Sequence, residues 1–534
     1  MKKTAFAIIL AALLLLLASC SGEVKAPDDS WENIFLQYWN AMNNEYVHFS
    51  DDSSFDWDKV YEEYLPKFQA LDYTNKEDSL TAFRYFKEIA VNVHDNHYNL
   101  KVTDGFGQSL SCSPAVLQKY KAAGGDIMDF PDITLVGNHG VPYPTSITDS
   151  GTYYDRSDKL KYYRKAIPSI TEVSDLGEEK DEDDVTVIKK SYFHSPTGNI
   201  ADEFGSAWCE CSFESVSDED KAKLDKEDAE IAEAWNTIVS TLGMSSCFFG
   251  VNSSNIFYIY ISDFGSPYFL SDILTKDDAK LTKEEKEELK NTDSLNKLRN
   301  LVQNIMLLST TISDTKLEKT VSEGIEGLKN LPVMYETLLS VTGTNSCTIN
   351  GVSKSGIEGV IVDLRCNGGG AVVFLEAIWG AFFSSETKFG NVRYKSGYSR
   401  LEYTPWTSFS IEKDFVNKAL AEKGSNYSNP VAVLVNGYSV SCSEISCVIS
   451  KLLPDSAIIG QTTFGGTCGL TDRKIYNSGP FVSEHLSVYT TTFQFVDNDM
   501  KSWEITGIEP DIRTELSSTK DDAYIKAVEW VKSR

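Results

Sequence analysis

Two short segments of this chain combine glycine and serine in a way that could bind and attack a carbonyl group. Residues 359–370 read as a buried strand that ends in three glycines, and residues 431–445 read as a buried strand followed by Ser441. In each segment the strand ends in a tight turn, and a helix begins directly after it. The first amides of a helix lack partners and carry partial positive charge, so both turns can present N–H donors to an oxyanion.

Ser441 is the candidate nucleophile. At the start of a helix its hydroxyl can project from a sharp turn, while the N–H of Cys442 points at the oxygen of an attacked carbonyl. The same residues also fit a capping box, Ser441-x-x-Glu444, in which the serine only satisfies the helix N-terminus. Taken alone, that segment favours the cap.

The glycine segment changes this balance. Gly368, Gly369 and Gly370 allow the backbone to approach a substrate closely and to take positive φ values, so one of their N–H groups could complete an oxyanion hole. A phosphate-binding loop is the rival interpretation, but no Lys-Ser/Thr follows the glycines and the G-x-G-x-x-G pattern is missing. Together the two segments favour an oxyanion site.

These motifs resemble a known family. The pattern Asp-Leu-Arg-x-Asn-x-Gly-Gly from Asp363, the later Ser-x-Ser-Glu from Ser441, and the sequence IIGQTTFG at 458–465 are similar to the carboxy-terminal processing (tail-specific) proteases and their tricorn-core relatives. The resemblance is strong over about 360–511. It implies an α/β fold with a ClpP/crotonase-like core, and a serine endopeptidase acting on peptides or proteins without a metal or organic cofactor. It also implies Ser441 as nucleophile, with Gly369 and Cys442 as backbone donors.

The expected base departs from the family pattern. Processing proteases carry a lysine in a Phe-Gly-Lys-Gly segment, whereas this chain has Gly466 in the lysine's place. A Ser–Lys dyad is therefore not expected, although Lys474 lies nearby in the sequence. The tricorn-like branch uses histidine and glutamate instead. That resemblance points to His97, because a histidine of pKa about 6.5 can accept and return a proton at neutral pH.

Several assignments stay open within this triad. His94 is the main competitor of His97, and His485 is the next; His97 could also only cap or pack. Glu504 resembles the acid of the tricorn relatives, but Glu509 is an alternative, and Asp95 or Asn96 could instead hold the histidine ring.

The N-terminus indicates export. Lys2 and Lys3 precede an apolar run over 5–17, which is too short to span a membrane and has the layout of a secretory signal. The run ends in Leu-Ala-Ser-Cys20, which looks like a bacterial lipobox. We therefore expect a signal peptide over 1–19, lipidation of Cys20 and a location in the bacterial cell envelope; an ordinary signal peptide with a chance cysteine is the alternative.

Composition excludes other classes of partner. A net charge of −28 and a pI near 4.7 argue against nucleic acid, because phosphates need a basic surface. Nine cysteines follow Cys20, so an intact monomer has at least one free thiol. Cys209-Glu210-Cys211 lacks the second ligand pair that zinc requires.

The chain divides into three expected parts. In residues 20–97, apolar residues recur every three or four positions, which predicts a small helical domain with helices near 31–46, 57–71 and 79–93. Residues 98–250 are an irregular mixed domain, either a divergent PDZ domain or a substrate domain. Residues 251–534 form the protease core, with a helical insertion at about 276–345. Two alternatives stay open: a catalytically inactive peptide-binding lipoprotein, and an esterase-type acyl hydrolase. The oligomeric state is not predicted.

Overall fold

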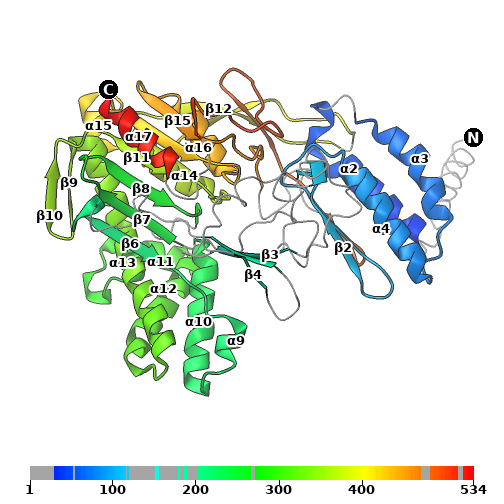
Figure 1. The fold of residues 1–534 in the computed structure, drawn as a ribbon, viewed down its shortest axis with the longest axis horizontal. Coiled ribbons are helices and arrows are strands. Elements are labelled where there is room, and N and C mark those ends of the chain that lie inside the picture. Colours follow the sequence, from blue (N-terminus) through cyan, green and yellow to red (C-terminus); the bar gives the residue numbers. More distant parts are fainter. Residues whose placement is uncertain are drawn as a thin grey trace, which may run out of the picture.

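The computed structural model describes residues 29–51, 55–115, 117–118, 203–244, 246–265, 271–397, 399–470, 481–514 and 521–534, together with the backbone of 151–155, 178–180 and 186–190. The expected signal peptide, Cys20, Lys474 and much of the expected middle domain lie outside these ranges. Among the helices described, none is both long and apolar enough for a membrane span. In Figure 1 the N-terminal unit lies at one end of the molecule and the C-terminal helix at the other.

A seven-stranded sheet forms the centre of the larger part. Its order is β19-β15-β14-β11-β8-β7-β6, with parallel neighbours from β19 to β8 and antiparallel pairing of β8 with β7 and of β7 with β6. The strands are β6 (Trp208–Ser212), β7 (Ser246–Val251), β8 (Phe257–Ile261), β11 (Val360–Asp363), β14 (Val431–Val435), β15 (Ser456–Gly460) and β19 (Ile512–Arg513). All residues of β8, β11 and β14 are buried, as expected of strands covered on both faces.

Helices cover both faces of this sheet, which confirms the α/β class. Alternate residues of a strand point to opposite faces. Val360, Val362, Val431 and Val433 therefore share a core with α14 (Val372–Gly380) and α16 (Cys442–Ser450). Ile361 and Leu434, with their neighbours on that face, pack against α17 (Asp522–Lys532).

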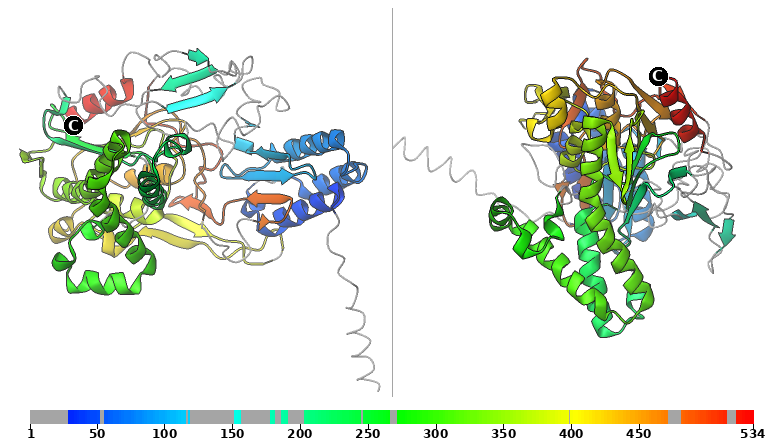
Figure 2. Two further views of the ribbon diagram at one scale, coloured as in Figure 1. Left: turned by 90° about the horizontal axis from the view of Figure 1, so that it is seen from below. Right: turned by 90° about the vertical axis from the view of Figure 1, so that its left-hand side faces the viewer.

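The expected insertion is helical. α11 (Lys283–Asn291), α12 (Asp293–Leu308) and the thirty-residue α13 (Thr315–Thr344) lie in it, and α10 (Lys226–Leu242) packs beside them. These helices project from one side of the sheet (Figure 1; Figure 2, right). β6 and β7 fall within the expected middle domain, yet they belong to the core sheet. β7 pairs with β8 and β6 pairs with β7, contacts that form only in the folded chain.

The N-terminal unit joins helices to a small sheet. The predicted helices are confirmed as α2 (Trp31–Glu45), α3 (Trp57–Gln69) and α4 (Lys76–Ala90), each started by a side-chain cap from Ser30, Asp56 or Asn75. They pack on a sheet of order β16-β17-β1-β2. Its strands are β1 (Asn99–Thr103), β2 (Ser109–Cys112), β16 (Phe481–Val482) and β17 (Leu486–Tyr489). A hairpin from the C-terminal region thus completes the N-terminal unit.

A third sheet connects the two units. It has the order β13-β12-β18, with β12 (Thr387–Arg393), β13 (Thr407–Ile411) and β18 (Gln494–Asp497). The connection between β12 and β13 runs toward the N-terminal unit (Figure 2, left). Basic side chains from this region bind there: Arg393 Nη2 donates to Ser50 Oγ at 2.8 Å, Lys395 Nζ to Asn43 O at 2.8 Å, and Arg400 Nη2 to Asp58 Oδ1 at 2.6 Å.

The remaining elements are short. They are the 3₁₀ turns η1 (Val47–Ser50), η6 (Asp272–Leu274), η7 (Asp278–Lys280), η8 (Ser309–Thr311) and η9 (Lys413–Phe415), the helices α9 (Asp218–Lys221) and α15 (Lys418–Lys423), the hairpin β9 (Ser346–Ile349) and β10 (Val352–Ser355), and the antiparallel sheet β3-β5-β4 (Gly151–Asp155, Thr186–Lys190, Glu178–Lys180).

Candidate active site

Ser441 occupies a strained turn between β14 and α16. Its φ of 58° and ψ of −118° lie in a region that residues other than glycine rarely adopt. Such backbone strain persists only where surrounding bonds fix it. Here the Ser441 N–H donates to Gly466 O at 2.9 Å and to Glu444 Oε2 at 3.2 Å. The Ser441 carbonyl in turn accepts the first helical N–H bonds of α16. The predicted projection of the serine from a sharp strand-to-helix turn is therefore present.

Glu444 does more than cap the helix. Besides the Ser441 N–H, its fully buried carboxylate accepts bonds from Thr463 Oγ1 at 2.5 Å and from the N–H groups of Gly465 and Gly466 at 2.7 Å each. The capping and catalytic interpretations of this segment are therefore compatible. The residue that caps α16 also ties the Ser441 turn to the 463–466 segment.

The glycine turn lies directly against Ser441. A Cβ on Gly369 (φ +98°) would lie 2.5 Å from Ser441 Cβ, and one on Gly370 (φ +136°) would lie 1.9 Å from the carbonyl oxygen of Phe264. Only glycine fits either position. The Gly369 N–H, a predicted oxyanion donor, donates to Asn367 Oδ1 at 2.8 Å. The other predicted donor, Cys442, is the first residue of α16, where helix amides lack helical acceptors.

His97 lies against Gly466. It follows α4 in a turn closed by a bond from Tyr98 N to Asp95 O. A Cβ on Gly466 would lie 3.2 Å from His97 Cε1 and 3.4 Å from His97 Nδ1. Since Gly466 also accepts the Ser441 N–H, the structure brings His97 and Ser441 to the same glycine. No hydrogen bond joins the Ser441 hydroxyl to the His97 ring within the described part of the chain.

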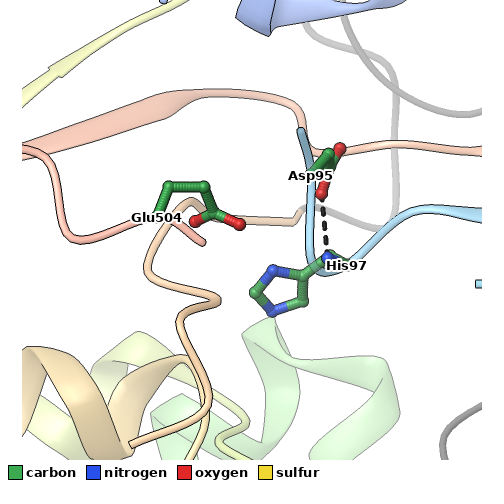
Figure 3. A group of neighbouring side chains, drawn as sticks. All are labelled: Asp95, His97 and Glu504. Carbon is green, nitrogen blue, oxygen red and sulfur yellow. Dashed lines mark hydrogen bonds between the residues drawn. The ribbon is translucent and has the colours of Figure 1, made fainter. Parts of the chain in front are cut away.

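Two carboxylates flank His97. Ligand-type atoms of Asp95, His97 and Glu504 all lie within 4.8 Å of one another, and Figure 3 shows one ring nitrogen of His97 on the side of Glu504. His97 Nδ1 is buried and has no hydrogen-bond partner among the described residues. Asp95 Oδ1 accepts the His97 N–H at 2.9 Å, the dashed line in Figure 3. Asp95 therefore fixes the backbone of His97 rather than its ring.

Glu504 is held by backbone donors. Its Oε1 accepts the N–H of Asn96 at 2.9 Å, and its Oε2 accepts those of Thr467 at 2.7 Å and Cys468 at 2.9 Å. These bonds keep a buried negative charge beside the His97 ring without a direct bond to it. Because the carboxylates of Asp95 and Glu504 already accept several N–H and O–H bonds each, the group favours a hydrogen-bonding role over binding a metal ion.

The competing candidates have other partners. His485 lies in the N-terminal unit, between Asp29 Oδ1 at 3.2 Å and the Tyr73 hydroxyl at 3.3 Å. Glu509 pairs with Arg513 at the surface. Asn96 binds the carbonyl oxygens of Phe464 and Gly465 through its side chain, so it supports the turn rather than the ring. The His94 N–H donates to the Tyr46 hydroxyl at 2.9 Å.

The Asp-Leu-Arg motif is structural. Asp363 is buried, pairs with Arg365 and accepts a bond from the Tyr258 hydroxyl at 2.8 Å. Arg365 also pairs with Asp521 at 2.6 Å, just before α17. This network fastens α17 to the sheet and pairs both charges of the motif beside a buried strand.

The cysteines beside the two turns form no disulfide in the structure. All nine described cysteines are buried and free, which confirms the expectation of at least one free thiol. Burial raises the pKa of Cys442 to about 12, so its thiol stays protonated and donates to Gly370 O at 3.2 Å. Cys442 thus contributes packing and a backbone amide rather than a reactive sulfur.

Two supporting residues were not predicted. Glu444 was recognised only as a cap, although its place in Ser-x-Ser-Glu was visible. His48, which binds the network around Asp95, gave no sequence signal, because its partners come from distant parts of the chain. Both act through tertiary contacts that no local pattern contains.

Comparisons with known proteins find similarity to proteases in two parts of the chain. Residues 338–514 match the family model described as Peptidase family S41, and residues 27–75 match the Tricorn protease C1 domain. The carboxy-terminal processing protease CtpA of Bacillus subtilis (strain 168) is 28% identical over 207 residues, which are 38% of this chain and 39% of that protein. The chain therefore matches well under half the length of this relative.

Two solved structures cover most of the chain at low identity. The photosystem II D1 C-terminal processing protease is 13% identical, with 91% of this chain and 93% of that chain covered and a TM-score of 0.32. Mature CPAF complexed with lactacystin is 12% identical, with 95% and 97% covered and a TM-score of 0.38.

Residues 338–514 are therefore similar to a family of peptidases, and the matched relative is a carboxy-terminal processing protease. The predicted resemblance to the carboxy-terminal processing proteases and their tricorn relatives is confirmed.

Replacing Glu444 with Gln is expected to flatten the dependence of stability on pH. Burial raises the pKa of Glu444 to about 7 from an ordinary value of 4.5, against the opposing bonds from Thr463, Gly465 and Gly466. The stabilisation from this proton is complete below the unfolded pKa and is lost as the pH rises toward 7. Urea unfolding of the variant should therefore show a smaller fall in stability across this window.

Glu376→Gln provides a matched control. Burial and the charge of Glu412 raise the pKa of Glu376 to about 7 as well, but this residue lies on α14 and is not among the hydrogen-bond partners of the 463–466 segment in the described part of the chain. Both variants should lose pH dependence, whereas only Glu444→Gln should slow reaction at Ser441, because its amide group would face three N–H donors. Equal pH slopes in the wild type and Glu444→Gln would contradict this assignment.

Proposed function

We propose that this protein is an exported serine endopeptidase that cleaves peptides or proteins through an acyl-enzyme, with Ser441 as nucleophile, His97 as base and Glu504 as the supporting acid. The observation that carries the proposal is the position of Gly466. Its carbonyl binds the Ser441 N–H, and its bare Cα leaves the space that the His97 ring occupies, at the position where the resembling proteases carry a lysine base.

The residues support a two-step reaction. Ser441 Oγ attacks the peptide carbonyl carbon while His97 accepts the hydroxyl proton; the histidine then returns this proton to the leaving amine as the C–N bond breaks. Water attacks the resulting ester in the same manner and releases the acid and the serine. The imidazolium formed in each step is stabilised by the nearby negative charges of Glu504 and Asp95.

The oxyanion would be bound by two backbone amides, those of Cys442 and Gly369. In the structure the Gly369 N–H is bonded to Asn367 Oδ1, so the substrate oxygen would replace this side-chain acceptor. Each such donor contributes roughly a hundred- to thousand-fold to the rate in serine proteases. The Cys442 amide adds the partial positive charge of the α16 N-terminus.

Ser441→Ala should abolish both peptide hydrolysis and covalent labelling by a fluorophosphonate probe, since the reacting oxygen is removed. Ser446→Ala is the matched control, because Ser446 lies on the same helix and its hydroxyl binds only Cys442 O at 2.7 Å. Undiminished labelling of the Ser441 variant would move the nucleophile elsewhere. Wild-type protein that stays unlabelled would favour a peptide-binding protein, and cleavage of small esters but not peptides would favour an esterase.

Gly466→Ala should lower the rate of labelling about tenfold, since a displacement of a catalytic group by about 1 Å costs up to a hundredfold. The added methyl group would press on the His97 ring at 3.2 Å. Gly105→Ala is the control, because its methyl group would meet the Tyr73 ring at 2.8 Å, outside the active site. The labelling rates of the two variants are compared at equal fractions of folded protein. Equal labelling rates would indicate that the base is not His97.

We also propose that the protein is anchored in the bacterial cell envelope by a lipid on Cys20, after removal of residues 1–19. Support comes from the lipobox-like sequence alone. Cys20→Ser should abolish incorporation of radiolabelled palmitate and move the protein from the membrane fraction to the soluble fraction of fractionated cells. Unchanged membrane association with no label in the wild type would contradict the anchor.

A further inference from the structure

A second buried histidine lies behind the active site. His48, in η1, is 1% exposed, and both of its ring nitrogens have partners. Nδ1 lies 3.0 Å from Asp51 Oδ2, and Nε2 lies 3.0 Å from Thr491 Oγ1. It is not one of the residues that the proposed reaction uses. Its contacts nevertheless lead to His97.

These contacts form a continuous chain. Thr491 donates its hydroxyl to Asp95 Oδ2 at 3.1 Å and its N–H to the same oxygen at 2.9 Å. The other oxygen of Asp95 accepts the backbone N–H of His97 at 2.9 Å. Between His48 and the base there are thus only two residues, both buried. From these contacts we propose that His48 is a positioning residue of the active site, which holds the His97 turn in place through Thr491 and Asp95.

The hydrogen bonds define the protonation of His48. The single hydroxyl proton of Thr491 goes to Asp95, so Thr491 Oγ1 must accept from His48 Nε2. Asp51 is a carboxylate and can only accept, so His48 Nδ1 must donate as well. Two donating nitrogens occur only in the imidazolium form. Burial by itself lowers the pKa of His48, but the bond to Asp51 and the charges of Asp95, Asp51 and Glu504 outweigh it and raise the pKa.

The location of these hydrogen bonds explains why they would affect the active site. His48 and Asp51 belong to the N-terminal unit, whereas Thr491 lies between β17 and β18, where the chain passes into the core. Asp51 also accepts a bond from Gln494 and lies 3.9 Å from Arg393. The buried cation therefore joins the two units beside the turn that carries the base. If this contact between the units were weakened, His97 would be displaced from Ser441. Such a displacement reduces the rate of reaction rather than substrate binding.

Thr491 provides the direct test, which rests on the proposed function. Thr491→Val removes the hydroxyl and keeps the shape, whereas Thr491→Ser keeps the hydroxyl. The valine variant should lose about tenfold in kcat with KM little changed, and the serine variant should retain wild-type kcat. Peptide hydrolysis is measured below the melting temperature of the less stable variant. Equal kcat values for the two variants would overturn the proposal.

His48→Gln supplies an independent readout, the pH profile. The charged and titratable groups that face His48 are Asp51, Asp95, Glu504 and Tyr46, whose ring centre lies 5.5 Å from that of His48; Arg393 lies behind Asp51. In the wild type, kcat should fall at alkaline pH as the imidazolium loses its proton. The variant should have a lower kcat without this alkaline fall. An unchanged profile in a folded variant would overturn the proposal, whereas a wild type that fluorophosphonates do not label would refute the proposed function instead.

Discussion

Two buried carboxylates hold the 463–468 segment by its backbone, and the geometry of the candidate site depends on them. Glu444 accepts the N–H groups of residues 465 and 466, and Glu504 accepts those of residues 467 and 468. Four consecutive backbone N–H groups are bonded in this way, so the segment has little freedom. Gly466 lies at its centre. The carbonyl of Gly466 accepts the Ser441 N–H, and its lack of a side chain leaves room for the His97 ring. The proposed nucleophile and the proposed base are thus positioned by one short stretch of backbone.

A histidine base makes this site depend on the contact between the two units. A lysine at position 466 would belong to the core itself, whereas His97 follows a helix of the N-terminal unit and must be brought to the core by docking. Several features secure that docking: the β16–β17 hairpin, the basic side chains beyond β12, and the turn held by Asn96 and Glu504.

Local features of the sequence predicted much of the site, and non-local ones supplied the rest. The strand-to-helix turns at Gly369 and Ser441 could be predicted because glycine content and buried strands are properties of adjacent residues. The three N-terminal helices followed from apolar spacing. By contrast, the pairing of β6 with β7 and the double role of Glu444 arise between residues that are not adjacent in sequence. The bond from Gly369 to Asn367 depends on turn geometry that composition does not specify.

The most direct measurement is a crystal structure of the protein after phosphonylation of Ser441. The phosphonyl oxygen occupies the place of the oxyanion, so it should accept bonds from the Cys442 N–H and from Gly369, released from Asn367. One ring nitrogen of His97 should then lie within about 3.2 Å of Ser441 Oγ. A His97 ring that stays beyond hydrogen-bond reach, with another side chain in contact with Oγ, would contradict the assignment of His97 as the base.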